Sequence, residues 1–235
     1  MSNIFSRTKA LLGAENIEKL KNSRVAVFGL GGVGSAAFEA LVRSGVGHID
    51  VFDYDTVSTT NLNRQLLATT KTVGMKKTEA ARLRAEEINA KAEIELHDMF
   101  YLPENSNQIN MANFDFVIDA VDTVTAKLEI IKNAIECGTP VISCMGTGNK
   151  MDVTKLKVTD ISKTEGCPLA RVMRKELRAR GIENLAVVFS SEKPFKEMDT
   201  GELKGNRPSP ASAIFVPAAA GLILAEQAVK HIINR

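Results

Sequence analysis

The stretch Val25-Ala26-Val27-Phe28-Gly29-Leu30-Gly31-Gly32-Val33-Gly34 joins an apolar run to closely spaced glycines. The run Val25–Phe28 predicts a buried strand, because short continuous apolar runs bounded by a turn signal suit parallel sheets. Gly29, Gly31 and Gly34 fit the spacing G-x-G-x-x-G, which allows a tight turn, close approach of the backbone to a phosphate, and close helix–strand packing. The stretch therefore predicts a strand, a phosphate-binding turn and a helix whose first N–H groups face the phosphate.

An acidic residue follows the next apolar run. The segment Ile49–Phe52 leads into Asp53, about 20 residues past the glycines, where a carboxylate can hold a ribose hydroxyl. These features indicate an adenine nucleotide, and an NAD-dependent oxidoreductase would share them.

Two cations and a second acid change this interpretation. A guanidinium at Arg64 and an amine at Lys77, placed beside phosphates, suit a triphosphate under attack better than a hydride carrier. Asp122 lies just past the expected strand 114–119, at the sheet edge where ligands bind, so its carboxylate can hold Mg²⁺. This set favours transfer of a nucleotidyl group to a carboxylate. Lys77 has the weaker claim, because the adjacent Lys76 or Lys77 itself could simply be solvated.

Strands and helices alternate along the first two-thirds of the chain. Apolar periodicity predicts strands at 24–29, 48–53, 93–97, 114–119 and 140–144, and helices at 8–22, 33–44, 75–89 and 124–137. Such alternation predicts a Rossmann-like, doubly wound, mostly parallel α/β sheet with right-handed connections.

The pattern changes after Gly148. We expect a nucleotide-binding core at 1–150 and a C-terminal α+β extension at 151–235, which completes the substrate side of a single domain. The extension is expected to contain a strand at 155–161, a basic helix at 168–180, a strand at 185–190, a mobile loop at 191–212 and a helix at 217–233.

Composition bounds the class of protein. The 235 residues suffice for one large α/β domain, and the net charge of +2 neither indicates nor excludes a nucleic-acid partner. Cys137, Cys144 and Cys167 form no C-x-x-C pair, so we expect a reducing, cytoplasmic compartment rather than disulfides or a zinc site. The apolar stretch Ala211–Ala225 is interrupted by Pro217, so we expect a buried helix and no stable membrane insertion.

Five segments together resemble the ubiquitin-activating-like adenylating family, which contains ThiF, MoeB and HesA. They are Gly29–Gly34, Asp53–Val57, Asn61–Gln65, Val73–Lys77 and Ile118–Thr123. The resemblance implies ATP and Mg²⁺ as cofactors, and catalytic roles for Arg64, Lys77 and Asp122, with Asp122 as the metal ligand. It implies that ATP is bound by Gly29, Gly31, Gly32, Gly34, Asp53, Asn61 and Gln65.

Two departures distinguish this chain from the sulfur-carrier branch of that family. That branch usually has two zinc-binding C-x-x-C pairs, which are absent here, and Asn where this chain has Thr123. Both departures are shared by the branch of tRNA threonylcarbamoyladenosine dehydratases. The similarity to this second branch continues, and so covers almost the whole chain, through Met145–Lys150, Val158–Ile161, Cys167–Arg171 and Ser212–Pro217.

This resemblance implies a reaction on tRNA. ATP adenylates the free carboxylate of the threonylcarbamoyl group on the adenosine next to the anticodon. A nucleophile within the same substituent then closes a ring and expels AMP, with net loss of one water. Because ring closure is intramolecular, effective molarity can replace an enzyme nucleophile.

The resemblance also implies partners: tRNA, a second copy in a symmetric homodimer, and a sulfur-relay protein. Arg7 resembles, over a short match, the family arginine that reaches ATP across the dimer interface. Cys167 precedes Pro168, so it is a candidate helix N-cap, a position that favours reactive thiolates, and hence a candidate nucleophile, although ring closure needs no thioester.

The basic helix carries four cations on one face. The usual interpretation is a solvated face. Because the implied substrate is polyanionic and this helix follows the active-site loop, contact with the tRNA backbone is the alternative hypothesis. The four residues are Arg171, Arg174, Lys175 and Arg178.

Three other functions stay open at this stage. They are adenylation of the C-terminal glycine of a ubiquitin-like sulfur carrier, hydride transfer with NAD, and non-catalytic sensing of a nucleotide. Substrate-dependent pyrophosphate release separates adenylation from hydride transfer, and AMP formation only with modified tRNA separates the tRNA substrate from a carrier protein.

Overall fold

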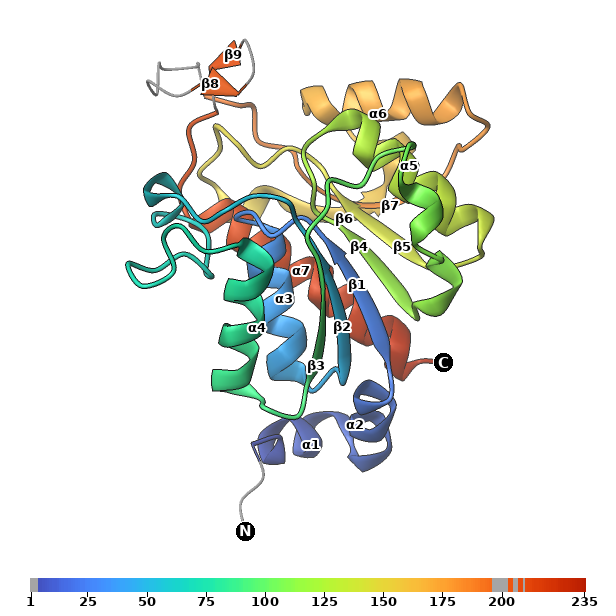
Figure 1. Cartoon of the computed structure of the whole chain (residues 1–235). Helices are drawn as coiled ribbons and strands as arrows, with labels where there is room; N and C mark the ends of the chain where they lie inside the picture. Colours follow the sequence, from blue (N-terminus) through green and yellow to red (C-terminus); the bar gives the residue numbers. More distant parts are fainter. Residues whose placement is uncertain (1–3, 196–202, 205–206, 209) are drawn as a thin grey trace.

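The computed structural model describes residues 4–195, 203–204, 207–208 and 210–235. Within these residues the main feature is a seven-stranded sheet with the order β3-β2-β1-β4-β5-β7-β6 (Figure 1). All of its neighbouring strands are parallel except β6 and β7, which are antiparallel. This confirms the expected doubly wound, mostly parallel sheet. The strands are β1 (Arg24–Phe28), β2 (His48–Phe52), β3 (Glu93–His97), β4 (Phe116–Asp119), β5 (Val141–Cys144), β6 (Leu156–Asp160) and β7 (Ala186–Ser190).

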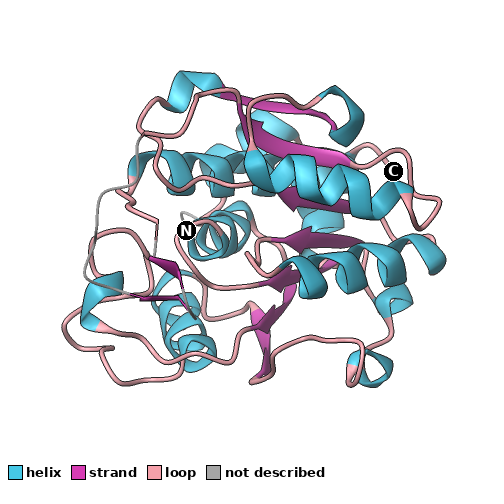
Figure 2. Cartoon of the chain, turned by 90° about the horizontal axis from the view of Figure 1, so that it is seen from above, coloured by secondary structure: helices cyan, strands magenta, loops and turns pink. Residues whose placement is uncertain are grey.

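Helices cover both faces of this sheet (Figure 2). On one face, apolar side chains of α3 (Gly34–Ser44), α4 (Lys77–Ile88) and α7 (Phe215–Ile233) pack with Val25 and Val27 of β1. On the other face lie α5 (Val124–Glu136) and α6 (Pro168–Arg178), whose buried side chains pack with those of β7. The alternation follows from the strand period of two, which turns Ala26 and Phe28 toward a third cluster with Phe52 and Phe114.

The strand order places one topological switch point at the carboxyl edge. β1 pairs with β2 on one side and with β4 on the other, so Phe28 lies opposite both Phe52 and Asp119. The loops that follow these three residues therefore meet at the point where the strand order reverses. In open α/β sheets ligands bind at such a switch point.

The C-terminal helix α7 belongs to the core. By length and composition alone its 19 residues could cross a membrane. However, a stripe of its side chains, from Val216 through Ala220 and Leu224 to Ala228, is buried against α3 and the sheet. A Cβ at Gly221 would lie 2.2 Å from the carbonyl oxygen of Val33, so glycine allows α7 to pack closely on the start of α3.

Two segments differ from the prediction. The helix expected at 8–22 is divided into α1 (Ser6–Leu12) and α2 (Ala14–Lys21), because Gly13 adopts φ +89° and ψ 159°, a conformation almost restricted to glycine. The loop expected at 191–212 contains the antiparallel pair β8 (Leu203–Lys204) and β9 (Arg207–Pro208). The rest of the predicted mobile segment, at 196–202, 205–206 and 209, lies outside the described residues.

Short 3₁₀ turns complete the connections. Their bounds are η1 (Thr59–Asn61), η2 (Ser106–Gln108), η3 (Met111–Asn113), η4 (Val153–Lys155) and η5 (Ile161–Lys163). The strands β6 and β7 of the C-terminal extension join the same sheet as β1 to β5. The core and the extension therefore share one continuous sheet.

Candidate active site

The glycine turn joins β1 to α3 at the carboxyl edge. A Cβ at Gly34 would lie 1.7 Å from the carbonyl oxygen of Gly29, so only glycine lets α3 begin so close to the strand end. A Cβ at Gly31 would meet no atom within 4 Å, which leaves the turn open on that side. The result is an open turn next to the N-terminus of a helix, an arrangement that favours a bound phosphate.

Asp53 follows β2 directly and turns toward the glycine turn. Its Oδ2 accepts a hydrogen bond from the backbone N–H of Leu30 at 2.7 Å, and its Oδ1 accepts one from Asp55 at 2.9 Å. Burial raises the pKa of the Asp53 carboxyl, although the charge of Lys77 opposes this shift. Each carboxylate oxygen has a second lone pair, so Asp53 can still accept a ribose hydroxyl.

Lys77 is the first residue of α4, and its side chain is almost entirely buried. The Nζ atom lies 2.7 Å from Asp55 Oδ2 and 3.7 Å from Asp53 Oδ1. The backbone N–H of Lys77 also donates to the carbonyl of Asp55 at 3.1 Å. Lys76 differs, because it is exposed and its Nζ donates to the carbonyl of Tyr54 at 3.2 Å. The structure thus separates the two lysines, and Lys77 is the one held beside the carboxylates that follow β2.

The loop after η1 brings Arg64 beside the glycine turn. The carbonyl oxygen of Arg64 lies 3.4 Å from the position that a Cβ at Gly32 would take. The backbone N–H of Leu66 donates to Ser35 Oγ at 3.1 Å, which attaches this loop to the first turn of α3. The guanidinium of Arg64 donates to the carbonyl of Thr60 at 3.0 Å, and the structure gives it no ion pair within the described residues.

Asn61 and Gln65 shape the same loop. The Oδ1 of Asn61 accepts the backbone N–H of Ser58 at 3.1 Å, within a capping box that caps the start of the 3₁₀ turn η1. Gln65 is buried, and its backbone N–H donates to the carbonyl of Asn61 at 2.9 Å. These contacts position Arg64, which lies between them in the sequence.

Asp122 lies on the loop that follows β4, and its side chain is exposed. Partial burial, together with the negative charges of Asp55, Asp53 and Asp122, raises the pKa of Tyr54. Asp122 is therefore close enough to the segment after β2 to act on Tyr54 electrostatically. A single carboxylate suits Mg²⁺, which is usually bound by one or two carboxylates and substrate phosphates.

A buried ion pair supports the loop that carries Asp122. Lys127 of α5 is fully buried, and its Nζ lies 2.9 Å from Asp119 Oδ2 and donates to the carbonyl of Val121 at 2.9 Å. Ser143 of β5 donates to the same carboxylate oxygen at 2.6 Å. Asp119 is structural, and the helical pattern of 124–137 gave no sign that Lys127 is its partner.

The comparisons with known proteins identify the family. A model of the ThiF family matches residues 5–235. The chain belongs to the ThiF family. It is 42% identical to the tRNA threonylcarbamoyladenosine dehydratase of Bacillus subtilis, in a match that covers 98% of this chain and 94% of that relative.

This ThiF-family chain is also similar to solved structures of a tRNA threonylcarbamoyladenosine dehydratase. The E. coli tRNA N6-threonylcarbamoyladenosine dehydratase TcdA, solved in complex with ATP, is 32% identical and superposes with a TM-score of 0.89, covering 98% of this chain and 93% of that chain. Its complex with AMP gives the same identity and TM-score. The adenylyltransferase and sulfurtransferase uba4 of Ogataea parapolymorpha is 37% identical, but that match covers 66% of this chain and 39% of the relative.

Cys167 of this ThiF-family chain is the N-cap of α6, as expected, and it is buried. Its Sγ lies 3.6 Å from the position of a Cβ at Gly146, and it packs in an apolar cluster with Met145 and Ile161. Lys150 was missed by sequence analysis. It is 5% exposed, its Nζ donates to the carbonyl of Ser190 at 2.9 Å, and burial lowers its pKa.

Arg7 is exposed on α1 and is not brought to the nucleotide site of its own chain. The ring of Phe5, in the preceding turn, lies 3.3 Å from the position of a Cβ at Gly45, which follows the C-terminus of α3. The glycine turn lies at the opposite end of that 11-residue helix. Only a second copy of the chain could bring an Arg7 to this site.

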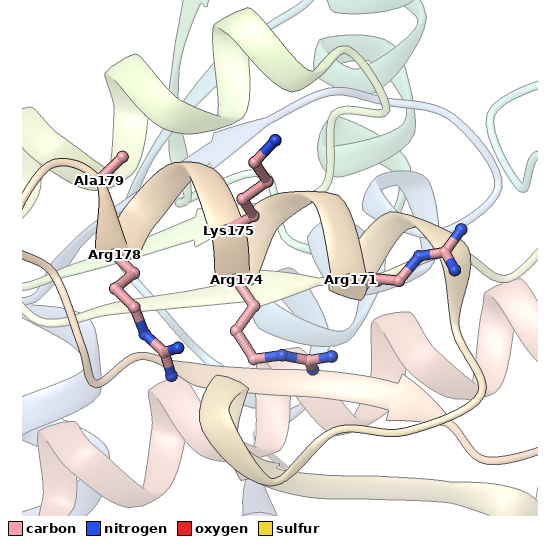
Figure 3. Close-up of a pocket in the computed structure, with 5 residues that line it drawn as sticks. All are labelled: Arg171, Arg174, Lys175, Arg178 and Ala179. Carbon is pink, nitrogen blue, oxygen red and sulfur yellow. The ribbon is translucent and has the colours of Figure 1, made fainter.

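The four cations of the basic helix lie together, away from the glycine turn. Their side chains line a surface hollow of about 400 Å³ along α6 (Figure 3). Arg174 points to one side of the helix axis and Lys175 to the other. The hollow is lined by Arg171, Arg174, Lys175, Arg178 and Ala179.

Proposed function

We propose that this chain uses ATP to dehydrate threonylcarbamoyladenosine in tRNA through a carboxyl-adenylate. One observation carries the proposal: the backbone of Arg64 lies against Gly32, while the buried Lys77 lies between the two carboxylates that follow β2. A phosphate-binding turn with two cations beside it suits ATP. The match over almost the full length of a named dehydratase supports this choice of substrate.

The side chains have distinct roles in this proposal. The Gly29–Gly34 turn binds the phosphates, and Asp53 accepts a ribose hydroxyl. Arg64 and Lys77 neutralise the charge that develops as pyrophosphate leaves. Asp122 would hold Mg²⁺, which supplies further neutralisation of phosphate charge when bound.

The reaction has two steps. A carboxylate oxygen of the threonylcarbamoyl group attacks the α-phosphorus, so a C–O–P bond forms while the bond to pyrophosphate breaks. A nucleophile of the same substituent then attacks the activated carbonyl carbon, and the bond to the AMP oxygen breaks. The oxygen that the substituent loses leaves in AMP, and the nucleophile's proton passes to solvent.

The second step needs no enzyme nucleophile. Ring closure is intramolecular, and holding the reacting groups together can supply roughly 7–11 kcal/mol of the barrier. This agrees with the burial of the Cys167 thiol among apolar side chains. We expect Cys167→Ala to retain ring closure.

The assembly proposed is a symmetric homodimer in the cytoplasm, in which Arg7 of each copy reaches the ATP site of the other. A sulfur-relay protein is a further proposed partner, since relatives include a sulfurtransferase. The dimer proposal explains how a residue beyond the far end of α3 can serve the glycine turn.

Mass spectrometry of tRNA nucleosides tests the proposed function. The protein is incubated with ATP, Mg²⁺ and tRNA that carries threonylcarbamoyladenosine, and the tRNA is digested without alkali, because an activated ring reopens easily. The proposal predicts a nucleoside that has lost one water, and AMP only when the tRNA is modified. An unchanged nucleoside would contradict it, and an adenylated carrier protein would identify the sulfur-carrier reaction instead.

A further inference from the structure

We propose that Arg171, Lys175 and Arg178 on α6 bind the phosphodiester backbone of the tRNA, while Arg174 positions the helix without contacting RNA. This inference rests on the proposed function for the identity of the polyanion. It divides the four cations into two groups by their contacts in the structure.

The three proposed RNA ligands have no acidic partner within the described residues. On α4, by contrast, Arg82 pairs with Glu79 and Glu86, and the latter pair has an N···O distance of 2.6 Å. The acid on the last turns of α6, Glu176, pairs with Arg180 at 2.9 Å and not with the cluster. Cations gathered without counter-charges repel one another, so a surface of this kind favours a negatively charged partner.

Arg174 differs from its neighbours because it is bound within the protein. Its Nη1 donates to the carbonyl of Thr164 at 2.8 Å and also contacts the hydroxyl of the same residue. A weaker bond of 3.4 Å reaches the carbonyl of Ile161 in the turn η5. Arg174 therefore attaches α6 to the segment after β6, and the side chain is half-buried.

One side of α6 is buried, so the three proposed RNA ligands on its other side face outward. Ala170, Met173 and Leu177 are buried in the cluster formed with α5 and β7. The ligand residues span eight positions, from 171 to 178, or roughly 10 Å of helix, a length that faces only a few phosphates of one strand.

The position of α6 connects this surface to the nucleotide site. Its N-cap Cys167 lies against Gly146, on the loop that follows β5 at the carboxyl edge of the sheet. Figure 1 shows α6 along the top of the molecule. A tRNA strand bound on α6 therefore lies at the sheet edge where its modified adenosine must reach the nucleotide site.

The test compares two triple variants with the same loss of charge. Arg171→Gln, Lys175→Gln and Arg178→Gln are combined in one protein. Lys21→Gln, Lys91→Gln and Lys230→Gln, all at exposed positions outside α6, are combined in the control. Each triple lowers the formal net charge from +2 by 3, to −1. Binding of an unmodified tRNA transcript is followed by fluorescence anisotropy at several salt concentrations.

The α6 triple variant should bind the transcript at least about tenfold more weakly at low salt, and the slope of log K against log salt should fall by about 2 to 3. The control triple should keep the wild-type slope. Arg174→Gln should lower the melting temperature and leave the slope unchanged. An α6 triple with the affinity and slope of the control would overturn the inference, as would a flattened slope in Arg174→Gln.

A kinetic measurement separates this inference from the proposed function. With modified tRNA, the α6 triple should raise KM and leave kcat near that of wild type, since the reacting atoms lie elsewhere. Suppose that wild type forms no dehydrated product, but the α6 triple variant still binds tRNA more weakly than wild type does. The proposed function is then wrong, and the assignment of α6 as the RNA-binding surface is retained. If wild type forms product and the α6 triple has an unchanged KM, the RNA surface is wrong.

Discussion

At the scale of single residues, Lys77 is held in place by contacts within the protein. Its side chain is 6% exposed and lies between Asp55 and Asp53. A cation fixed in this way needs no reorganisation when negative charge develops on a leaving group, which is the main source of electrostatic catalysis. Burial of Asp53 raises the pKa of its carboxyl, and the charge of Lys77 opposes this shift.

Replacement of Lys77 by Met should therefore reduce activity strongly. We expect Lys77→Met to lower kcat for AMP formation on modified tRNA by about 10²–10³, the usual effect of removing one preorganised group at a developing charge. Lys76→Met is the matched control, because this neighbour is exposed and its Nζ donates to the backbone carbonyl of Tyr54. Its kcat should stay within about threefold of wild type. Equal losses in the two variants would contradict the assignment, and circular dichroism checks that both are folded.

The residues of the site were predictable to different degrees. Asp53, Arg64 and Lys77 lie within short motifs that can be recognised in the sequence, and the structure brings all three to the switch point. The buried Lys127 was not predictable, because a lysine at a helix start is usually solvated. Lys150 was missed for the same reason, since only the tertiary structure shows that its side chain is enclosed.

At the scale of elements, a charged network joins three strands at the surface opposite α3. Asp50 of β2 is 2% exposed and accepts hydrogen bonds from Arg24 of β1 at 2.7 and 2.9 Å. The Nε2 of His97 on β3 lies 2.9 Å from the same carboxylate. Burial alone would raise the pKa of Asp50, but the bonds from His97 and Arg24 outweigh it and lower the pKa.

This lowered pKa predicts a pH-dependent stability. The contribution of Asp50 is complete above about pH 4, the pKa of an unfolded Asp, and is lost as pH falls through the lower folded pKa. Asp50→Asn should therefore lower the free energy of unfolding by about 2 kcal/mol at pH 7, less than for a fully buried pair, since Arg24 can rehydrate. Urea unfolding at a series of pH values measures the difference, which should shrink below about pH 4.

A surface variant on the same sheet gives the control. Glu95→Gln on β3 removes an exposed carboxylate, and we expect an effect within about 0.5 kcal/mol. A difference between wild type and Asp50→Asn that stays constant down to about pH 2 would contradict the role given to the carboxylate.

Elements were predicted best where apolar runs are long. The strands of the core lie within two residues of their expected positions, because buried parallel strands appear as continuous apolar segments. The division of the first helix at Gly13 was missed, although glycine gave a local signal, because the apolar pattern continues across it. The pairing of β8 with β9 has no such pattern, since two-residue strands leave no periodicity.

At the scale of the whole molecule, the separation of Arg7 from the glycine turn decides whether one chain or two would build the proposed site. They lie beyond opposite ends of α3 in one chain, so the proposed contact of Arg7 with ATP requires a second copy. Symmetry would then give two sites, each built from both chains.

Mixed dimers test this arrangement. Arg7→Ala and Arg64→Ala should each be nearly inactive alone. When they are mixed in equal amounts and allowed to exchange subunits, half of the dimers are mixed and each has one site with both arginines. Activity should therefore recover to about a quarter of wild type. A fully active Arg7→Ala variant, or no recovery on mixing despite subunit exchange, would contradict a shared site.

The most direct test of the central claim follows one oxygen atom. Modified tRNA is prepared with ¹⁸O in both carboxylate oxygens of the threonylcarbamoyl group and incubated with the protein, ATP and Mg²⁺. If the carboxylate attacks the α-phosphorus, each AMP released must carry one ¹⁸O, because the bridging oxygen leaves with AMP. Mass spectrometry of the nucleotides should show singly labelled AMP and unlabelled pyrophosphate. Unlabelled AMP, or ADP with labelled phosphate, would contradict adenylation by this site.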